Sequence, residues 1–315
     1  MENSIEKNRL LIKLCQMYYE EGLTQQEIAK RFGVSRPHIS RMLTTAKNEK
    51  LVEIIIHNPY KNEQNLEKAF IEKFGIREVI VINYEESKPL LTSLAEAVIA
   101  FLESTIQDNQ VIGVMAGKTI AEVTKTIEYF PRNNLQFVPL VGGWDSEGNE
   151  YNANTNTMHI ANKMKSKYKL LHVPAIVKSV EVATLLKEEK GIQEVLLFAQ
   201  KCDIALIGIG DVSSNATIYT SKNLPEQALE DLINLGAVAN ICASFLDKTG
   251  NIISQSIIEK RMIGLHAQEL RSIPSVIAVA GGNQKINAIK AVLQGKWVDV
   301  LIIDSQTAKA VLKTL

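Results

Sequence analysis

Apolar residues near the start of the chain recur at helical spacing. Two short helices are each predicted by one apolar face, formed by Ile28, Ala29 and Phe32 in the first and by Ile39, Met42, Leu43 and Ala46 in the second. Thr24 and Glu27 have the spacing of a capping box at the start of the first helix, and Gly33 can take the left-handed conformation that ends it. Ser35 is placed to cap the second helix, whose first turn tolerates Pro37. Two such helices joined by a short glycine-containing turn predict a helix–turn–helix.

Beyond Pro59 the pattern changes to short apolar strands that alternate with helices. The predicted strands span residues 78–83, 110–115, 135–141, 169–177, 203–210, 275–282 and 298–304. Their continuous β-branched character is typical of a parallel sheet covered on both faces, and intervening helices such as 90–106 and 283–293 predict a doubly wound α/β sheet. Residues 239–254 differ, because they predict an inserted hairpin around a turn at 247–250.

The boundary between these two patterns falls near Asn58–Pro59. The segment "LVEIIIHNP", residues 51–59, predicts the first strand of the chain and one edge of a small wing, and residues 60–74 predict a connecting helix. A chain of 315 residues is also long enough for about two domains. We therefore expect a helix–turn–helix domain over residues 1–58 and a mostly parallel α/β domain over residues 59–315.

Composition narrows the class of protein. The chain has 35 Lys and Arg against 35 Asp and Glu, so a wholly basic nucleic-acid coat is excluded. Its three cysteines are scattered and form no C-x-x-C pair, which argues against a disulfide framework or a zinc site and fits a reducing compartment. Neither a signal sequence nor an apolar stretch of about 18 residues is evident. We expect a cytoplasmic protein with no membrane partner, no metal and no cofactor.

Positive charge is nevertheless concentrated around the second predicted helix. Residues 30–50 contain six Lys and Arg against one acid, Glu49. An arginine near the start of a helix in the major groove can bind guanine with two hydrogen bonds, while hydroxyl groups and free helix amides hold phosphates. The alternative, without DNA binding, is a solvent-exposed helical hairpin with a basic face. We predict binding to double-stranded operator DNA through Ser35, Arg36, Pro37, His38, Ser40, Arg41 and Thr44.

Glycine-containing loops follow several predicted strands of the larger domain. The loops "MAGKT", "GGW", "GIGD" and "AGGNQK" fall where open α/β sheets bind ligands, at the carboxyl ends of the strands. Glycine permits close backbone approach and a following helix offers free amides to an anion, although such a glycine often only makes the turn. The candidate effector-binding residues are Gly117, Lys118, Thr119, Gly142, Gly143, Asn154, Asp211, Asn240, Gly281, Gly282, Asn283 and Lys285, and Trp144 is a candidate for stacking on a sugar.

Six segments in order give the chain a resemblance to a known family. They are "MYYEEGLTQQEIAKRFGVSRPHISRML", "IGVMAGKTIAEV", "FVPLVGG", "DIALIGIGD", "GAVANICASFLDKTG" and "VIAVAGGNQKINAIKAVLQGKWVDVLIID". Together they resemble the SorC family of bacterial sugar-responsive transcriptional regulators along nearly the full length. The resemblance implies an effector domain similar in fold to sugar-phosphate isomerases, assembly as dimers or tetramers, and a phosphorylated sugar held near Lys285.

Two residues depart from what the resemblance implies. Val141 stands where some relatives carry a basic residue that faces the ligand, and Asn240 stands where relatives usually have a carboxylate that accepts sugar hydroxyls. An apolar Val141 cannot pair with a second phosphate, and an amide at Asn240 hydrogen-bonds without charge. The inferred effector is therefore a singly phosphorylated sugar or polyol.

Two other functions remain open from the sequence. An isomerase-like enzyme would need a general base, for which Asp145, Asp211 and Asp304 are the carboxylates at strand ends, with no histidine beside them. Alternatively, the large domain serves only to form oligomers. The leading interpretation is a regulator, not an enzyme, whose operator affinity is controlled by the effector.

Overall fold

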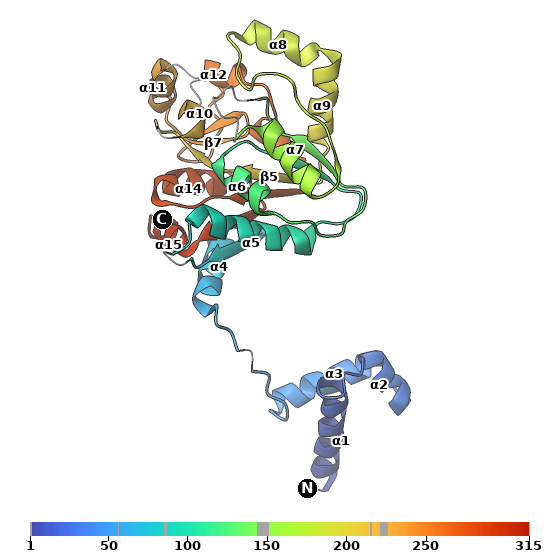
Figure 1. Ribbon diagram of the computed structural model, residues 1–315. Coiled ribbons are helices and arrows are strands. Elements are labelled where there is room, and N and C mark those ends of the chain that lie inside the picture. The colour runs from blue at the N-terminus through green and yellow to red at the C-terminus, as the bar shows by residue number, and fades with distance from the viewer. Residues whose placement is uncertain are drawn as a thin grey trace. The chain divides into compact units, whose positions relative to one another are not determined.

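The computed structural model describes residues 2–55, 57–84, 87–143, 151–214, 216–220 and 226–314. The chain divides into two compact units, Met1–Pro59 and Tyr60–Leu315, which are described separately below (Figure 1). In the parts of the chain that the structure describes, no helix combines the length and the apolar character needed to cross a membrane.

The unit Met1–Pro59 is a bundle of short helices. Its helices are α1 (Glu2–Tyr19), α2 (Gln25–Phe32) and α3 (Arg36–Asn48). They enclose a core of Leu11, Leu14, Cys15, Met17, Ile28, Ala29, Ile39, Leu43 and Ala46. The predicted capping box is confirmed, because the Thr24 amide donates to Glu27 Oε2 (2.8 Å) and the Glu27 amide donates to Thr24 Oγ1 (3.3 Å). Gly33 ends α2 at a φ of 67°, the left-handed conformation expected there.

The predicted wing is wrong for the residues that the structure describes. Residues 51–55 and 57–59 form no strand, and Ile54 and Ile55 are exposed. A single extended segment without a neighbouring strand leaves its amides and carbonyls unpaired, so an apolar β-branched run is not sufficient to make a strand.

A parallel sheet forms the centre of the unit Tyr60–Leu315. Among its described residues, seven strands pair in the order β1–β10–β9–β5–β2–β3–β4, and every pairing is parallel. These strands are β1 (Glu78–Ile82), β2 (Val111–Val114), β3 (Gln136–Pro139), β4 (Lys167–Tyr168), β5 (Ile204–Gly208), β9 (Ser275–Val279) and β10 (Val300–Asp304). Strands β2, β5, β9 and β10 are almost completely buried, as their continuous apolar sequences predict.

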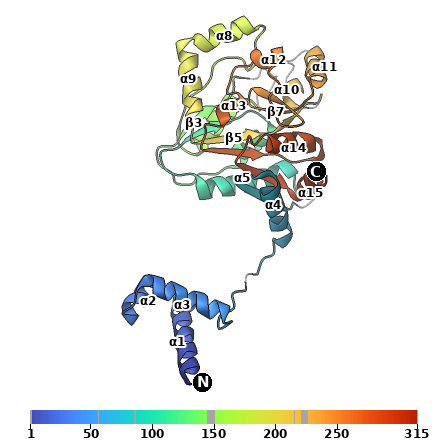
Figure 2. The ribbon, with the colours of Figure 1, turned by 180° about the vertical axis from the view of Figure 1, so that it is seen from behind.

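Helices cover both faces of this sheet. The longer ones are α4 (Lys61–Phe74), α5 (Leu90–Thr105), α6 (Lys118–Thr126), α7 (Ala153–Lys163), α8 (Val180–Glu188), α9 (Lys190–Gln200), α11 (Glu226–Asn234), α14 (Ile286–Gln294) and α15 (Ser305–Lys313). Helices α5, α6 and α7 lie side by side on one face, and α4, α15 and α14 lie on the other (Figures 1 and 2). The doubly wound α/β fold is thereby confirmed.

Shorter elements complete the unit. They are α10 (Thr217–Thr220), α12 (Ile257–Lys260), α13 (Ala267–Leu270), the 3-10 turn η1 (Asn283–Lys285) and an antiparallel sheet of β6 (Gly210–Asp211), β7 (Ala237–Ile241) and β8 (Ser244–Asp247). The predicted hairpin exists, but its turn lies at Cys242 and Ala243 rather than at 247–250. After the turn that ends at Gly250, the chain pairs with β8 through an isolated β-bridge between Leu246 and Ile252, and it forms no further named strand there.

The predicted strand 169–177 is also wrong. Strand β4 ends at Tyr168, and beyond it only isolated bridges form, at Pro174 and Ile176. Pro174 has no amide hydrogen to donate to a ladder, so a proline inside an apolar run argues against a regular strand.

The strand order identifies one position where the winding of the sheet reverses. From β2 the chain moves outward through β3 to β4, and from β5 it moves the opposite way through β9 to β10. Right-handed crossovers in opposite directions put their helices on opposite faces, so a crevice opens between the carboxyl ends of β2 and β5. This crevice is where an open α/β sheet binds its ligand.

Candidate functional site

The first candidate site is the outward face of α3. Among the predicted DNA-binding residues, Ser40 is half-buried. The others are exposed: Ser35, Arg36, Pro37, His38, Arg41 and Thr44. The opposite face holds the buried Ile39, Leu43 and Ala46, so α3 is fixed from behind. Ser35 has the backbone of a cap residue but makes no side-chain capping hydrogen bond, which corrects its predicted capping role.

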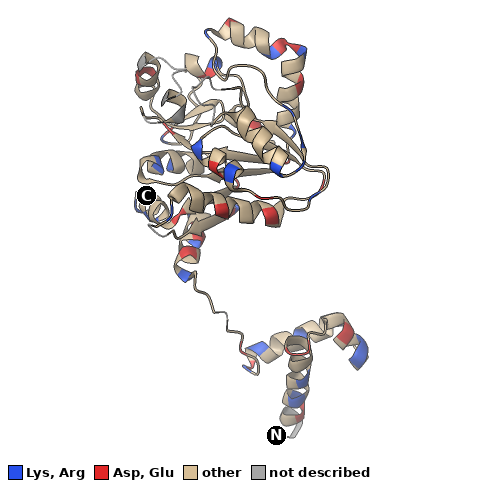
Figure 3. Ribbon diagram, in the orientation of Figure 1, with Lys and Arg blue, Asp and Glu red and all other residues tan. Residues whose placement is uncertain are grey.

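The charge on α3 is available to a ligand. In the described part of the chain, neither Arg36 nor Arg41 forms an ion pair, whereas Lys7 and Glu49 pair elsewhere in the unit (3.3 Å). The ribbon of Figure 3 has blue segments, which mark Lys and Arg, on α1, α2 and α3. An unpaired guanidinium on an exposed helix can approach phosphates or base edges without first breaking an internal contact.

The second candidate site is a cavity of about 560 Å³ at the reversal of the sheet. It is lined by the segments that follow β2, β5 and β9, three neighbouring strands, and by Asn240 from β7. Seven of the predicted effector-binding residues line it: Gly117, Lys118, Thr119, Asp211, Asn240, Gly281 and Lys285. The remaining lining is mostly apolar, from Leu90, Leu91, Met115, Ala116, Ile120, Ile209, Ala216 and Ile218.

The loop after β2 offers donors to an anion. Gly117 is the cap residue of α6 at a φ of 123°, and it has no side chain. Among the residues that the structure describes, no side chain caps the first turn of this helix. Thr119 is buried, and Lys118 is exposed with its Nζ 5.7 Å from the Tyr151 ring centroid. The arrangement brings the amides of a helix start, a hydroxyl and an ammonium group to the cavity.

Lys285 enters the cavity from the segment after β9. Burial lowers the pKa of Lys285 below its usual value, the carboxylate of Asp211 opposes this shift, and the ammonium of Lys118 adds to it. Ser213 donates a hydrogen bond to Asp211 Oδ2. Two ammonium groups and one carboxylate give the cavity an excess of positive charge that an anionic ligand would compensate.

The glycines before Lys285 differ from the prediction. The amide of Gly282 donates to Thr307 Oγ1 (2.8 Å), so it is not free for an anion, and Gly282 and Asn283 do not line the cavity. Gly281 lines it, and a Cβ there would come within 2.6 Å of Asp304 Oδ2. Gln284, which the sequence reasoning missed, faces the cavity from this loop instead.

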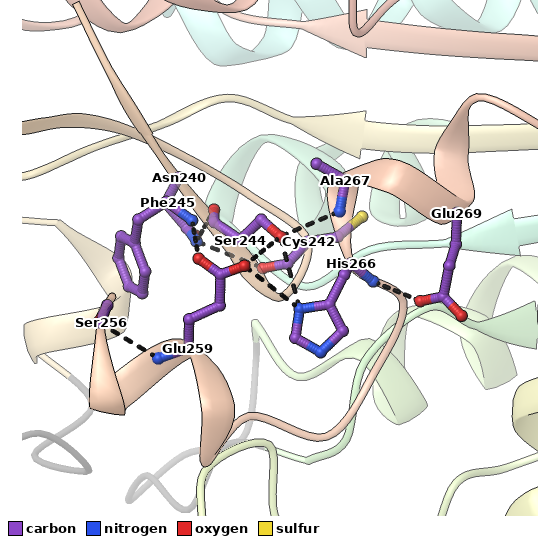
Figure 4. A network of polar contacts seen from close by, with 9 residues as sticks. All are labelled: Asn240, Cys242, Ser244, Phe245, Ser256, Glu259, His266, Ala267 and Glu269. Atoms are coloured by element: carbon purple, nitrogen blue, oxygen red, sulfur yellow. Dashed lines mark hydrogen bonds and ion pairs between the residues drawn. The ribbon is translucent and has the colours of Figure 1, made fainter. Parts of the chain in front are cut away.

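Asn240 belongs to a polar network on and beside the β7–β8 hairpin (Figure 4). Its Nδ2 donates to the carbonyl oxygens of Ser244 (2.9 Å) and Cys242 (3.3 Å), while no donor reaches its Oδ1 from the residues that the structure describes. Both amide hydrogens are thereby used, and the amide orientation is fixed. Asn240 can therefore accept a hydrogen bond from a ligand hydroxyl but cannot donate one.

The same network contains a serine, a histidine and a glutamate. Ser244 donates to Glu259 Oε1 (3.1 Å), and His266 Nδ1 lies 3.5 Å from Ser244 Oγ and 3.6 Å from Glu259 Oε1. In a catalytic triad the serine and the acid contact opposite ring nitrogens, whereas here both contact Nδ1. Ser244 is also completely buried and accepts the Ala267 amide (3.0 Å). The network therefore secures the β7–β8 hairpin and does not present a nucleophile.

Three other predicted residues have structural partners outside the cavity. The Asn154 side chain donates to the carbonyl of Leu171 (3.0 Å) and accepts its amide (2.9 Å). Gly142 and Gly143 pair with the backbone of Ile263 and Val173, and a Cβ on Gly142 would come within 2.7 Å of the Val173 oxygen. These glycines permit close approach of another part of the chain rather than of a ligand.

Val141 and Asp304 do not line the cavity either. Val141 is fully buried in the core, and Asp304 is buried while it caps α15 through the Thr307 amide (2.9 Å). Trp144 and Asp145 lie outside the described residues. The apolar lining residues such as Leu90, Met115 and Ile218 carry no sequence signal that separates them from the core.

Comparison with known proteins finds a family model that matches each of the two units. Residues 58–313 match the family model "Putative sugar-binding domain", and residues 6–48 match "Sigma-70, region 4". The deoxyribonucleoside regulator of Bacillus subtilis (strain 168) is 30% identical over 313 residues, which cover 98% of this chain and 99% of that protein. The sorbitol operon regulator of Klebsiella pneumoniae is 25% identical over 317 residues, covering 99% and 100% of the two chains.

Solved structures give the same picture. A crystal structure of the full-length sorbitol operon regulator SorC from Klebsiella pneumoniae has a TM-score of 0.74 over 98% of this chain and 99% of that chain, at 24% identity. A transcriptional regulator from Streptococcus pneumoniae TIGR4 has a TM-score of 0.75 over 82% and 99%, at 26% identity. A helix–turn–helix unit joined to a sugar-binding α/β unit is the architecture of sugar-responsive transcriptional regulators. The chain belongs to the SorC family of these regulators.

Proposed function

We propose that the chain is a cytoplasmic regulator of a carbohydrate operon, and that a small, singly phosphorylated sugar or polyol controls its affinity for double-stranded operator DNA. The observation that carries this proposal is the polarity of the cavity at the sheet reversal. The start of α6, Thr119, Lys118 and Lys285 all line it, and Asn240 presents an acceptor for a hydroxyl. The buried, apolar Val141 offers nothing to a second phosphate.

The operator would be read by the exposed face of α3. Arg36 and Arg41 would supply base or phosphate contacts, and the exposed Ser35 hydroxyl would donate to a phosphate. The Thr44 hydroxyl donates to the carbonyl of Ser40 (3.0 Å), so Thr44 would have to release this bond before it could donate to a phosphate. The protein would be a homo-oligomer with more than one arrangement of its recognition helices. The effector can change operator affinity only by binding one of these arrangements better than another, which shifts the population toward that arrangement.

A catalytic role has weaker support. Asp211 is the one carboxylate among the described residues that line the cavity, and no histidine accompanies it there. Ring opening and enolisation need a positioned acid and base, which this lining does not provide. A role in oligomerisation alone would leave the convergence of Lys118, Thr119 and Lys285 without a purpose.

The test is the thermal stability of the intact protein across a panel of sugars and sugar phosphates. A ligand at 100 times its dissociation constant should stabilise the fold by about 2.7 kcal/mol. Lys285→Ala should abolish the shift, while Lys309→Ala, an exposed lysine on α15, should keep it. The active compound should then change operator affinity in a fluorescence anisotropy titration. A shift that Lys285→Ala leaves intact, or no shift with any phosphorylated compound, would refute the proposed effector site.

A further inference from the structure

Thr307 is a buried threonine whose hydroxyl binds a distant part of the chain. It lies in the first turn of α15 and is 1% exposed. Its Oγ1 accepts a hydrogen bond from the amide of Gly282 (2.8 Å), which is 25 residues away in the sequence. Its own amide donates to Oδ1 of Asp304 (2.9 Å), the residue that caps α15. Thr307 therefore ties the turn at Gly282 to the start of α15.

Buried threonines in two other helices use their hydroxyls differently. Thr124 Oγ1 donates to the carbonyl of Ala121 (2.9 Å) in α6, and Thr157 Oγ1 donates to the carbonyl of Ala153 (2.7 Å) in α7. Both bonds stay within one turn of the helix, a common arrangement for threonine. Thr307 Oγ1 instead accepts its bond from outside its own helix, so it contributes to the position of another segment.

The residue that Thr307 holds is bonded directly to Lys285. The carbonyl oxygen of Gly282 accepts a hydrogen bond from the Lys285 amide (3.0 Å), at the 3-10 turn η1. Gly282 thus joins Thr307 and Lys285 through its amide and its carbonyl. Its φ of 98° lies in the left-handed region that glycine favours, so the turn follows a path that other residues rarely adopt. The position of the Lys285 main chain therefore depends on the bond to Thr307.

Close packing fixes the same turn from a second side. A Cβ at Gly281 would lie 2.6 Å from Asp304 Oδ2 and 3.0 Å from Leu94 Cδ1. Asp304 and Leu94 are both buried, so neither side chain is free to move toward solvent. The turn therefore has little freedom at the point where it leads to Lys285.

We propose that Thr307 is a positioning residue of the effector site, and that its hydroxyl holds the Gly282 turn so that the Lys285 ammonium group reaches an anion in the cavity. Of these three residues, Lys285 alone lines the cavity, so Thr307 acts through it. A flexible lysine binds better when its main chain is already held in place, because less freedom is lost on binding. The inference rests on the proposed function in one respect, since it requires Lys285 to contact an anionic group.

The experiment compares variants of the full chain by the rise in melting temperature with ligand concentration, which gives the affinity. The probes are inorganic phosphate and the sugar phosphates of the stability panel. Thr307→Val removes the hydroxyl and should weaken binding about three- to tenfold, as the loss of one hydrogen bond implies. Thr307→Ser keeps the hydroxyl and should bind like the unsubstituted chain. Thr157→Val, the same change at a buried threonine that bonds within its own helix, should leave the affinity unchanged.

A pH profile separates positioning from a general loss of structure. Lys285 binds an anion in its ammonium form, and the charged groups that influence it, Asp211 and Lys118, are the same in every variant. The affinity of the unsubstituted chain should fall as the pH rises through the pKa of Lys285. The affinity of Thr307→Val should fall less, so that the two curves converge at alkaline pH. A general loss of structure would lower the affinity by the same factor at every pH.

Three results would overturn the positioning role. They are an unchanged affinity in Thr307→Val, whatever its melting temperature, an equal loss of affinity in Thr307→Ser, and two pH curves that remain parallel. In each of these cases, binding of the probes by the unsubstituted chain would leave the proposed function intact. If no probe protects the unsubstituted chain, the proposed effector site and the positioning role are both refuted.

Discussion

The sequence predicts that Asn154 binds the effector, whereas its hydrogen bonds in the structure favour a structural role. Its amide group clamps both backbone atoms of Leu171, with hydrogen bonds of 3.0 Å and 2.9 Å. Leu171 is completely buried, so neither atom can turn to water when the clamp is removed. Each lost hydrogen bond costs about 1–2 kcal/mol once the stranded partner is included, and Asn154→Ala should therefore destabilise the unit by about 2–4 kcal/mol.

The expected change in melting temperature depends on the size of the folded unit. At about 2–4 °C per kcal/mol for a domain of this size, Asn154→Ala should lower the melting temperature by about 5–15 °C. Its affinity for the compound found in the stability panel should be unchanged at a temperature where the variant is folded. Asn162→Ala, the same change at an exposed position of α7, should leave the melting temperature unaltered. An Asn154→Ala protein with normal stability and weakened effector binding would refute the structural assignment.

Three further predictions use other parts of the molecule. Arg41→Ala should weaken operator binding by about 1–3 kcal/mol, measured by fluorescence anisotropy titration. It should leave the melting temperature unchanged in a thermal denaturation curve, because the Arg41 side chain is exposed and makes no ion pair among the described residues. Effector affinity should be retained at neutral pH and fall as the pH rises through the pKa of Lys285, which burial lowers below 10.5, because only the ammonium form pairs with a phosphate. Lys285→Arg should remove that fall, since a guanidinium does not titrate there, and an unchanged pH profile would contradict the assignment. Gly142→Ala should destabilise the unit by about 1–3 kcal/mol, because its Cβ would come within 2.7 Å of two backbone oxygens, whereas Gly191→Ala, with open space around it, should not.

Local signals in the sequence predicted the elements well where the signal and the packing coincide. The capping box at Thr24 and the buried face of α3 follow from residue type and spacing alone. Strands β5 and β10 are rich in apolar residues, and each has a parallel neighbour on both sides in the sheet, as expected for buried parallel strands. Segments 51–59 and 169–177 were predicted wrongly because strand formation depends on a neighbouring strand that the segment's own sequence does not encode.

The cavity was only partly predictable for a related reason. A glycine after a strand indicates that something approaches the backbone closely, but not what approaches. At Gly117 the space is open, whereas at Gly142 it is filled by the backbone near Pro174. The apolar wall at Leu90 and Met115 carries no signal, because a residue that faces a cavity and one that faces the core have the same chemistry.

The position of the cavity also constrains how an effector could act. Lys118 begins α6 on one face of the sheet, and Lys285 precedes α14 on the opposite face. A ligand that contacts both lysines therefore joins helices from the two faces across the sheet reversal. A ligand shifts the equilibrium between two arrangements of the protein only by its differential affinity for them. A compound that fills only one end of the cavity should therefore have little effect on this equilibrium. Inorganic phosphate should therefore protect the fold weakly and leave operator affinity unchanged, whereas a phosphorylated sugar that also reaches Asn240 should change both.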